Sequence, residues 1–397
     1  MKKLAIIGSG RMAWIFGRNA KEMGIESHAF SFDDNCIAKE SVSEHHLVNI
    51  LEKDKILEMC RSIGINGVVA TTELTVPVAA YVAEKMGLNG MPFEVAQVVT
   101  DKYRNRIACK NVIELSQPGF AEVQTLNEIK SLNFSYPIIL KPTSKGGKKG
   151  ISVVRNEDEL SAAFELAKAN SGSCPIIVEE YISDGQEYSV ESLSFHGTHT
   201  VVQVTEKISS GPPHCVELGH HQPANLSREM RQKLEVAIEK GLAAIGVDNS
   251  TCHTEIKIVK DKIYLIEFNA RPGGDHIAWP LTELSTGYPY IKGAIDIALN
   301  QLKPVEKSSL LKRYAGVYFV TTQSAYLKPL YDKCEEYTWL YKKNIVSSEL
   351  QPLEHNDCYG TNSMMYYSEI GRPDINILQG KDEEEIENDI ICVEGGV

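Results

Sequence analysis

The chain has 397 residues, enough for two or three domains with cores of their own. Its 43% apolar and 24% charged content excludes a disordered chain, and its net charge of −12 argues against a general nucleic-acid surface. Nine cysteines without a CxxC pair are typical of reduced thiols. The first apolar run is too short for a signal peptide, and no run reaches the length of a membrane span. We therefore expect a cytoplasmic protein whose partners include neither nucleic acid nor membrane.

The N-terminus reads as a βαβ unit. A buried strand at 3–8 runs into the glycine turn Gly8–Ala13 and a helix that ends near residue 23. A second strand at 27–30 ends just before Asp33. This pattern matches G-x-G-x-x-A with an acidic residue at the dinucleotide distance, but any Rossmann-like unit needs a tight turn there. An NAD(P)-dependent oxidoreductase is therefore one alternative, and a plain strand-to-helix turn is the other.

The first domain is expected to close near residue 98. A strand at 68–71 is followed by Thr72 and Glu73, at the strand end where open α/β sheets present ligands. The apolar spacing that follows predicts a helix over 76–86.

A glycine-rich loop dominates the next part of the chain. Thr100-Asp101-Lys102 is predicted to start a helix, and a strand at 136–142 carries Lys141 near its end. The loop over residues 143–150 follows directly. Glycines let backbone N–H groups approach an anion, and the lysines add positive charge. The loop is either phosphate-binding or a flexible surface loop; it is not a Walker A loop, because no helix follows it.

Strands are predicted over 175–182 and 187–191, and an amphipathic helix over 228–245. Between them, 211–221 is irregular and carries a histidine pair, His220 and His221. A zinc site is not favoured there, because no third ligand lies at zinc spacing.

The most informative stretch is Cys252 to Asp275. Two β-branched runs separated by Lys260-Asp261-Lys262 read as a hairpin, and a three-residue loop would place Glu255 directly opposite Glu267. Strand alternation would add Asn269 and Arg271 to the face of Glu267.

Two carboxylates directly opposite on a sheet destabilise it unless something neutralises them. A divalent cation with hard oxygen ligands, such as Mg²⁺, would do so and would leave room for phosphate oxygens. In the other interpretation, the face is exposed and the carboxylates pair with Lys257 and Arg271.

After a helix at 290–299, the pattern changes to short β-like runs, such as 314–321 and 364–367. They predict a small β-rich C-terminal module. The acidic stretch 381–389 is expected to be a solvated helix or tail.

Taken in order, these motifs resemble those of the ATP-grasp superfamily over residues 1–300. They are the lysine at a helix start, the strand lysine, the glycine-rich loop, Val-Glu-Glu-Tyr-Ile, Glu-x-x-Val-Glu and Glu…Glu-x-Asn-x-Arg. Gly-Pro-Pro-His-Cys-Val-Glu-Leu-Gly-His-His-Gln-Pro and Asn-Ala-Arg-Pro-Gly-Gly-Asp-His-Ile further resemble the L-amino acid ligases that make dipeptides.

The resemblance implies an α/β and α+β architecture in three parts. These are a Rossmann-like preATP-grasp domain (1–98), an ATP-grasp domain (99–304) with a lid at about 112–190, and the β-rich C-terminal module with its acidic tail (305–397). A homodimer is expected.

The resemblance also implies roles at matching positions. ATP would contact one set of residues: Lys102, Lys141, Ser144, Gly146, Gly147, Gly150, Glu179, Glu180, Ile182 and Glu187. Mg²⁺ (or Mn²⁺) would be held by Glu255, Glu267 and Asn269. Arg271 and His220 would be catalytic, and the amino-acid substrates would meet Glu73, His220, Gly273 and Gly274.

The implied activity is that of an ATP-dependent carboxylate–amine ligase. ATP converts a carboxylate to an acyl phosphate, an amine attacks the acyl carbon, and Arg271 meets the negative charge that develops on oxygen. The main alternative is an ATP-grasp ligase with another acceptor, such as a carrier-protein thiol or a purine-pathway amine.

Overall fold

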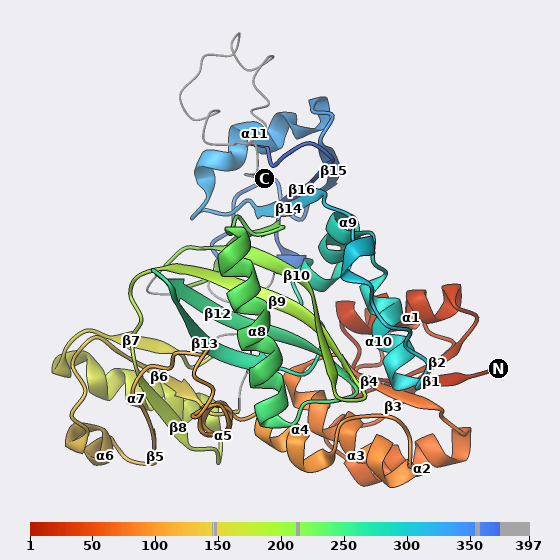
Figure 1. The fold of residues 1–397 in the computed structure, drawn as a ribbon, viewed down its shortest axis with the longest axis horizontal. Coiled ribbons are helices and arrows are strands. Elements are labelled where there is room, and N and C mark those ends of the chain that lie inside the picture. Colours follow the sequence, from red (N-terminus) through yellow and green to blue (C-terminus); the bar gives the residue numbers. More distant parts are fainter. Residues whose placement is uncertain (145, 147–148, 212–214, 354–357, 374–397) are drawn as a thin grey trace.

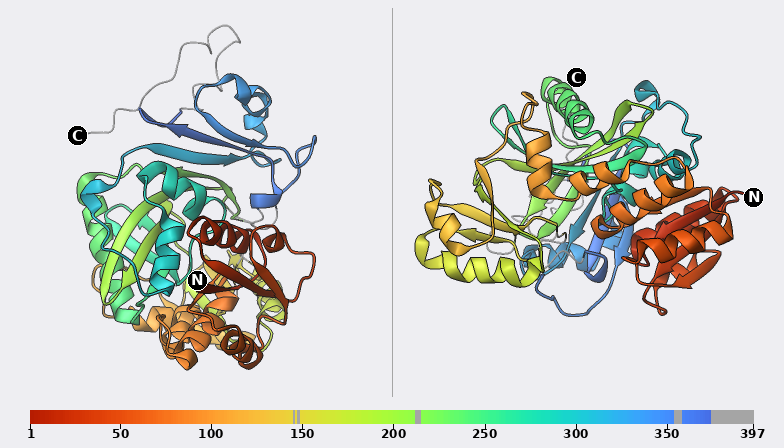
Figure 2. Two further views of the ribbon diagram at one scale, coloured as in Figure 1. Left: turned by 90° about the vertical axis from the view of Figure 1, so that its right-hand side faces the viewer. Right: turned by 90° about the horizontal axis from the view of Figure 1, so that it is seen from below.

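A computed structural model describes residues 1–144, 146, 149–211, 215–353 and 358–373. Within them the strands form three sheets. Seen from below, the small sheet and the N-terminal sheet lie on opposite sides of a large central sheet (Figure 2). Among the described residues, no helix has both the length and the apolar character that a membrane crossing requires.

The N-terminal sheet is parallel, in the order β3-β2-β1-β4. Its strands are β1 (Lys3–Ile7), β2 (Glu26–Ser31), β3 (Glu44–Leu47) and β4 (Gly67–Ala70). Helix α1 (Arg11–Glu22) connects β1 to β2, as a parallel crossover requires. The predicted βαβ unit and the helix over 76–86 (α3, Val76–Met86) are confirmed. Strand β3 was not predicted, because its residues Glu-His-His-Leu have no strand-like apolar alternation.

The large sheet is antiparallel, in the order β13-β12-β9-β10-β11-β14-β16-β15. Its strands are β9 (Gln186–Phe195), β10 (Thr198–Ser209), β11 (Glu217–Gln222), β12 (Ser250–Val259), β13 (Lys262–Asn269), β14 (Tyr314–Phe319), β15 (Leu340–Asn344) and β16 (Ser363–Ser368). The C-terminal strands thus extend this sheet through the β11–β14 pair and do not form a sheet of their own (Figure 1).

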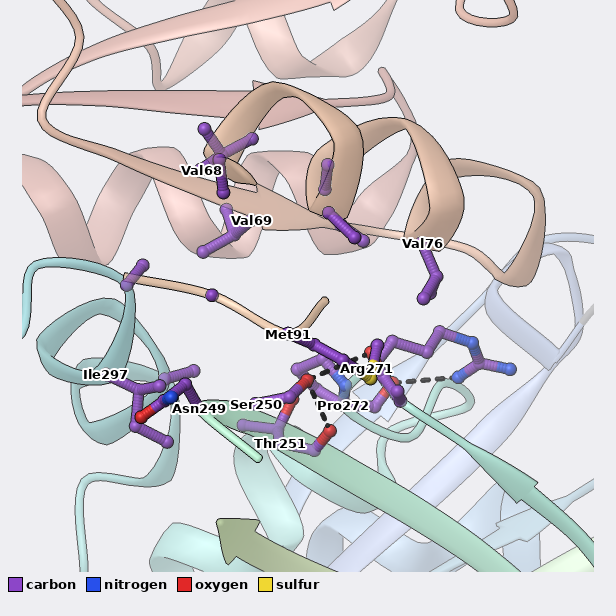
Figure 3. A pocket seen from close by; sticks show the side chains of 18 of the residues that line it. Val68, Val69, Val76, Met91, Asn249, Ser250, Thr251, Arg271, Pro272 and Ile297 are labelled. Atoms are coloured by element: carbon purple, nitrogen blue, oxygen red, sulfur yellow. Dashed lines mark hydrogen bonds between the residues drawn. The ribbon is translucent and has the colours of Figure 1, made fainter. Parts of the chain in front are cut away.

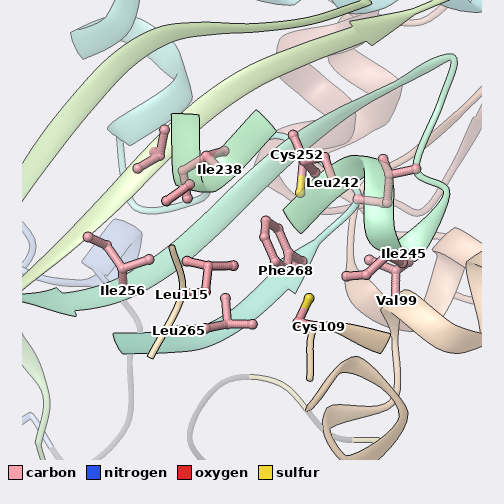
Figure 4. Close-up of a cluster of buried hydrophobic side chains, with 14 of the residues drawn as sticks. Val99, Cys109, Leu115, Ile238, Leu242, Ile245, Cys252, Ile256, Leu265 and Phe268 are labelled. Atoms are coloured by element: carbon pink, nitrogen blue, oxygen red, sulfur yellow. The ribbon is translucent and has the colours of Figure 1, made fainter. Parts of the chain in front are cut away.

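Helix α8 (Arg228–Ile245), predicted to the residue, covers one face of the large sheet. Figure 4 shows Ile238, Leu242 and Ile245 packed with Ile256, Leu265 and Phe268 of the hairpin. A Cβ at Gly241 would lie 2.5 Å from the Phe268 ring, so glycine allows this close approach. Because these apolar residues face α8, alternation turns Glu255 and Glu267 to the opposite face.

The small sheet has the order β5-β8-β6-β7 and is covered by helices α6 and α7, which bury Ile129, Leu160 and Phe164. Its strands are β5 (Phe120–Val123), β6 (Ile138–Pro142), β7 (Ser152–Val154) and β8 (Ile176–Glu180). The remaining α-helices are α2 (Lys53–Ile63), α4 (Phe93–Val99), α5 (Lys102–Ala108), α6 (Leu126–Ser131), α7 (Glu157–Ser171), α9 (Thr282–Thr286), α10 (Tyr290–Ala298) and α11 (Lys328–Lys333).

Candidate active site

A cavity of about 300 Å³ lies where the three sheets meet. Glu73 reaches it from the end of the N-terminal sheet, Lys141 and Glu179 from the small sheet, and Glu255 and Glu267 from the large sheet. The cavity therefore collects charged side chains from segments far apart in the chain. Twelve of the predicted site residues line it: Glu73, Lys102, Lys141, Gly146, Glu179, Glu180, Ile182, Glu187, Glu255, Glu267, Arg271 and Gly274.

Glu255 and Glu267 are directly opposite each other, as predicted, but the hairpin achieves this differently. The predicted three-residue loop is wrong: Val259 pairs with Lys262, so the loop has two residues. Lys260 takes a φ of 55°, the positive value that a tight hairpin needs at its first central residue. A β-bulge then shifts the register between Glu255 and Ile256, which leaves Ile266 as the extra residue and restores the carboxylate pair.

Glu267 is held between a cation and an amide. Lys102 Nζ lies 3.0 Å from its Oε2, and Asn269 Nδ2 donates to its Oε1 at 3.0 Å. Burial alone would lower the pKa of Lys102, but the Glu267 carboxylate raises it. Lys102 opens helix α5, as predicted, because the side chain of Asp101 caps the helix by accepting from the N–H of Arg104.

Glu255 is flanked by two cationic groups that were not predicted as site residues. Lys207 Nζ lies 3.4 Å from its Oε1 and 2.7 Å from Glu217, and His253 Nε2 lies 3.4 Å from the same Oε1. The other ring nitrogen of His253 contacts the buried Glu191 carboxylate at 2.5 Å. Burial would raise the pKa of Glu255, but Lys207 and His253 outweigh it and lower that pKa.

Arg271 lines the same cavity as Glu267, as predicted, but it lies two residues beyond the end of β13, so strand alternation is not what orients it. Its Nη2 bonds the Glu73 carboxylate, and its Nη1 donates to the Pro272 carbonyl at 2.8 Å. Arg271 and Pro272 also line a separate pocket of about 60 Å³, whose lining is drawn in Figure 3. This apolar space, lined by Val68 and Val69 among others, is too small for a substrate.

A buried ion cluster lies on the small-sheet side. Arg106 Nε and Lys141 Nζ each lie 2.6 Å from a different oxygen of Glu179. Burial would raise the pKa of Glu179, but the two cations lower it to about 2. The Glu179 side chain thus orients Lys141 toward the cavity; Arg106 was not predicted as a site residue.

The described part of the glycine-rich loop lies beside this cluster. A Cβ at Gly146 would come within 2.8 Å of the Glu73 carboxylate, so a side chain there would have to displace that carboxylate. Ser144 Oγ lies 3.4 Å from Asp101, the cap of α5, and Ser144 and Gly150 are not among the cavity-lining residues. Gly147 lies outside the described residues.

The segment after β8 also lines the cavity, through Tyr181 and Ile182. The N–H of Glu180 donates to the Gly119 carbonyl at 2.9 Å, so that donor is already used. The Ile182 carbonyl accepts from Lys257 Nζ at 2.8 Å. Glu187 lines the cavity from the start of β9.

His220 does not lie in an irregular loop, as predicted, but in strand β11, where it is fully buried. Its Nε2 lies 3.0 Å from Glu217, whose side chain lines the cavity. Asp275 lines the same end of the cavity; burial and the nearby Glu217 raise the pKa of Asp275. His220 thus backs the acidic end of the cavity from behind and is not among the cavity-lining residues.

Gly273 also lies behind the cavity wall. Its N–H donates to Glu191 at 3.0 Å, and a Cβ there would lie 2.6 Å from both Glu191 and His253. Gly274 lines the cavity, and a Cβ added to it would meet no atom within 4 Å.

A second cavity of about 310 Å³ adjoins the first. The glycine turn (Gly8, Gly10) and Arg11 line it together with Thr71. The two cavities share three residues, which are Glu73, Arg271 and Gly274. The N-terminal glycine turn therefore faces the same site as the hairpin.

The oxygen atoms of Glu255, Glu267 and Asn269 could hold a divalent cation. Two carboxylates and an amide are hard oxygen donors of the kind Mg²⁺ takes. Lys102 and Lys207 balance the two carboxylates, and Lys102 lines the same cavity as they do.

Comparison with known proteins gives this arrangement a class. Residues 134–279 match the model of the ATP-grasp domain. The formate-dependent phosphoribosylglycinamide formyltransferase of Wolinella succinogenes is 24% identical over 274 residues, which cover 68% of this chain and 70% of that protein.

Solved structures agree in fold. The L-amino acid ligase from Bacillus licheniformis superposes with a TM-score of 0.77 at 22% identity, covering 93% of this chain and 94% of that one. The biotin carboxylase domain dimer of 2-oxoglutarate carboxylase from Hydrogenobacter thermophilus, solved with MgADP and bicarbonate, has a TM-score of 0.72 at 19% identity, with 92% and 86% covered.

The chain has the ATP-grasp fold, its residues 134–279 match the ATP-grasp domain, and it is an enzyme of the ATP-dependent ligase type (EC 6.3). ATP-grasp enzymes use ATP with Mg²⁺. A ligase of this class needs no nicotinamide cofactor, and the oxidoreductase alternative has no support.

Proposed function

We propose that this chain joins two L-amino acids, in an ATP-dependent reaction that passes through an acyl phosphate and releases ADP and phosphate. The observation that carries the proposal is the meeting of two cavities at Glu73, Arg271 and Gly274. One cavity offers the opposed carboxylates and lysines that suit Mg²⁺ and phosphates. The other offers space for a small substrate.

In this proposal, the first cavity holds the nucleotide. Lys102 and Lys141 contact the phosphates, with Ser144, Gly146 and Gly150 over them. The Glu179–Ile182 segment lies along the adenine, with Glu180 and Ile182 contributing backbone groups, and Glu187 reaches the ribose. Mg²⁺, held by Glu255, Glu267 and Asn269, would neutralise phosphoryl charge.

Arg271 acts where the cavities meet. Its guanidinium already faces a carboxylate, that of Glu73, so it can meet an anionic oxygen at that point. Gly273 and Gly274 continue its backbone past the site. The acidic end at Glu217 and Asp275, backed by His220, suits the ammonium group of an amino acid.

A second acceptor is favoured by a specific observation. The glycine turn and Arg11 line the second cavity at the start of α1, where a phosphate could bind. Phosphoribosylglycinamide, which the Wolinella relative's name contains, is therefore the competing substrate. The two ligand-binding motifs around His220 and Arg271 resemble those of L-amino acid ligases and favour the first proposal.

The test is phosphate release from MgATP, screened over pairs of amino acids and, separately, over phosphoribosylglycinamide with formate. We expect release only with particular amino-acid pairs, together with a product of the dipeptide's mass. Glu267→Gln serves as the inactive control. Phosphate release that needs phosphoribosylglycinamide, and none with any amino-acid pair, would overturn the proposal while leaving the ligase class intact.

We also propose a homodimer, the state in which the Hydrogenobacter thermophilus domain was solved. Light scattering of the purified protein tests it directly, and a monomer mass at micromolar concentration would contradict it.

A further inference from the structure

The N-terminal sheet carries a group of side chains that the ligase reaction does not use. In the parallel pairing of β2 with β3, His28 lies opposite Glu44, and Phe30 opposite His46. Alternation puts all four side chains on the same face of the sheet. β3 is the edge strand of this sheet.

Three potential ligand atoms converge there. His28 Nδ1 lies 3.0 Å from His46 Nε2 and 3.6 Å from Glu44 Oε2, and His46 Nε2 lies 4.0 Å from the same oxygen. A tetrahedral zinc ion with bonds of about 2.0–2.1 Å holds its ligand atoms roughly 3.3 Å apart. The observed separations lie on either side of that value, so small shifts would complete the site.

The surroundings already orient the rings. Glu26 Oε1 lies 3.0 Å from His28 Nε2, so that nitrogen carries the proton and Nδ1 turns its lone pair toward His46 and Glu44. Lys3 in turn lies 3.2 Å from Glu26. A carboxylate on the far nitrogen of a histidine is the usual outer support of a metal-bound imidazole. The Phe30 ring stacks on His46 with centroids 4.8 Å apart.

Access and burial suit a bound ion. The His28 side chain is 2% exposed and that of His46 is 12% exposed, whereas the Glu44 side chain is 61% exposed. An ion can therefore enter past Glu44 and bind to the two buried imidazole rings. Among the described residues, no fourth protein ligand joins the group, so water would complete the coordination.

We propose that His28, Glu44 and His46 form a binding site for a divalent transition metal of the zinc class, separate from the magnesium ligands of the hairpin. Two imidazoles and one carboxylate suit Zn²⁺ or Co²⁺ and disfavour Mg²⁺, which prefers oxygen ligands. The ion would fasten the short edge strand β3 to β2. The site's competitor is a plain hydrogen bond in which His46 Nε2–H donates to His28 Nδ1.

The experiment titrates the tag-free full-length protein with Co²⁺, in excess Mg²⁺ to occupy the oxygen ligands of the hairpin. We expect one equivalent of Co²⁺ with the visible bands of tetrahedral coordination, displaced by Zn²⁺, and a melting temperature that Zn²⁺ raises. Glu44→Gln, at an exposed position, should weaken Co²⁺ binding by at least about tenfold. Glu26→Gln should weaken it by roughly tenfold through loss of ring support.

His45→Ala is the matched control, because His45 lies between two proposed ligands on β3 but its ring contacts Ser31 at 2.9 Å. This variant should keep the Co²⁺ spectrum and the Zn²⁺-dependent rise in melting temperature. Two results would overturn the proposal. One is the absence of a tetrahedral spectrum in the wild type, which would leave a His–His hydrogen bond only. The other is equal Co²⁺ affinity in the wild type and Glu44→Gln.

Discussion

In the proposed function, Arg271 is present in the resting site and acts mainly in the transition state. Its guanidinium is paired with Glu73, and its planar donor fork reaches Pro272 as well. Burial would lower the pKa of Arg271, but the Glu73 carboxylate raises it, so the group stays charged. An arginine held this way costs little reorganisation when a new negative oxygen forms beside it.

Substitution of Arg271 should separate chemistry from binding. Arg271→Lys keeps the charge and loses the planar fork, so we expect kcat to fall by about 100-fold or more while the affinity for ATP changes little. Steady-state kinetics with the substrates found by the screen measure both. Arg231→Lys, on the outer helix α8, should leave kcat unchanged. A variant that keeps its turnover but loses ATP affinity would make Arg271 a ground-state phosphate ligand.

Glu179 supports a prediction about pH. Its pKa of about 2 in the folded protein lies below the ordinary 4.5, so its ion pairs stabilise the fold above pH 4.5. That stability is lost as the pH falls from 4.5 toward 2. Glu179→Gln leaves Arg106 and Lys141 buried beside a neutral amide, and should lower the unfolding free energy at pH 7 by roughly 3 kcal/mol.

Urea unfolding at several pH values checks this. The gap between wild type and Glu179→Gln should narrow by about 1.4 kcal/mol for each pH unit below 4.5. Glu180→Gln is the matched control on the same strand, because that side chain is exposed. A gap that stays constant down to pH 3 would show that the ion cluster does not stabilise the fold through Glu179's charge.

At the level of elements, regular helices could be predicted from the sequence, but the exact pairing of the hairpin strands could not. Helices α3 and α8 were predicted with their observed bounds, because apolar spacing and end signals agree in each. The β-bulge was not predicted, because Ile266 is an apolar β-branched residue like its neighbours and carries no sign of being the extra one. The carboxylate pair was correct although the loop length was wrong.

The missed site residues have a different cause. His253 lies two residues before Glu255 on β12, so strand alternation could have placed it on the same face. Lys207 and Glu217 belong to β10 and β11, and only the order β12-β9-β10-β11 brings them near Glu255. No local pattern marks such a residue, because strand order is a property of the whole sheet. His220 was predicted to lie in a loop because turn residues precede it in the sequence. In the structure it lies in β11, which pairs with β14.

The turn after β13 supports the third prediction. A Cβ at Gly273 would lie 2.6 Å from Glu191 and His253, two buried groups that cannot move apart without losing their contact. Gly273→Ala should therefore lower the unfolding free energy by roughly 1–3 kcal/mol. Gly274→Ala is the control, since a Cβ there meets nothing within 4 Å, and its stability should change by no more than about 0.5 kcal/mol. Equal stability of the two variants would mean that Glu191 and His253 can move to make room for the Cβ at no cost in stability.

For the whole molecule, the cavity is the place where the three sheets meet. Glu73, Glu179 and Glu255 line it from the N-terminal, small and large sheets respectively. Apolar contacts also join the N-terminal and large sheets, because Leu4 and Leu193 belong to the same buried cluster as helix α10. A ligand in the cavity should therefore stabilise segments that are far apart in the sequence.

The last prediction tests, by hydrogen exchange, whether one ligand stabilises segments on all sides of the cavity. A nonhydrolysable ATP analogue with Mg²⁺ should slow amide exchange in three segments together: α5 (Lys102–Ala108), the β6–β8 pair and the Glu255–Glu267 part of the hairpin. Without Mg²⁺, protection of the β6–β8 pair should persist in part, because Lys141 and the segment after β8 would still meet the nucleotide. The hairpin should lose its protection, because its carboxylates would have no ion to share.

Glu267→Gln separates the two contributions in the same measurement. With Mg²⁺ present, this variant should resemble the wild type without Mg²⁺, since the amide removes one charged ligand but keeps the size of the side chain. Arg231→Lys should behave as the wild type throughout. If the analogue protects only the small sheet, and the hairpin exchanges equally fast with and without Mg²⁺, then Glu255 and Glu267 do not hold the ion. In that case Lys102 and Lys207 alone would have to neutralise the two opposed carboxylates.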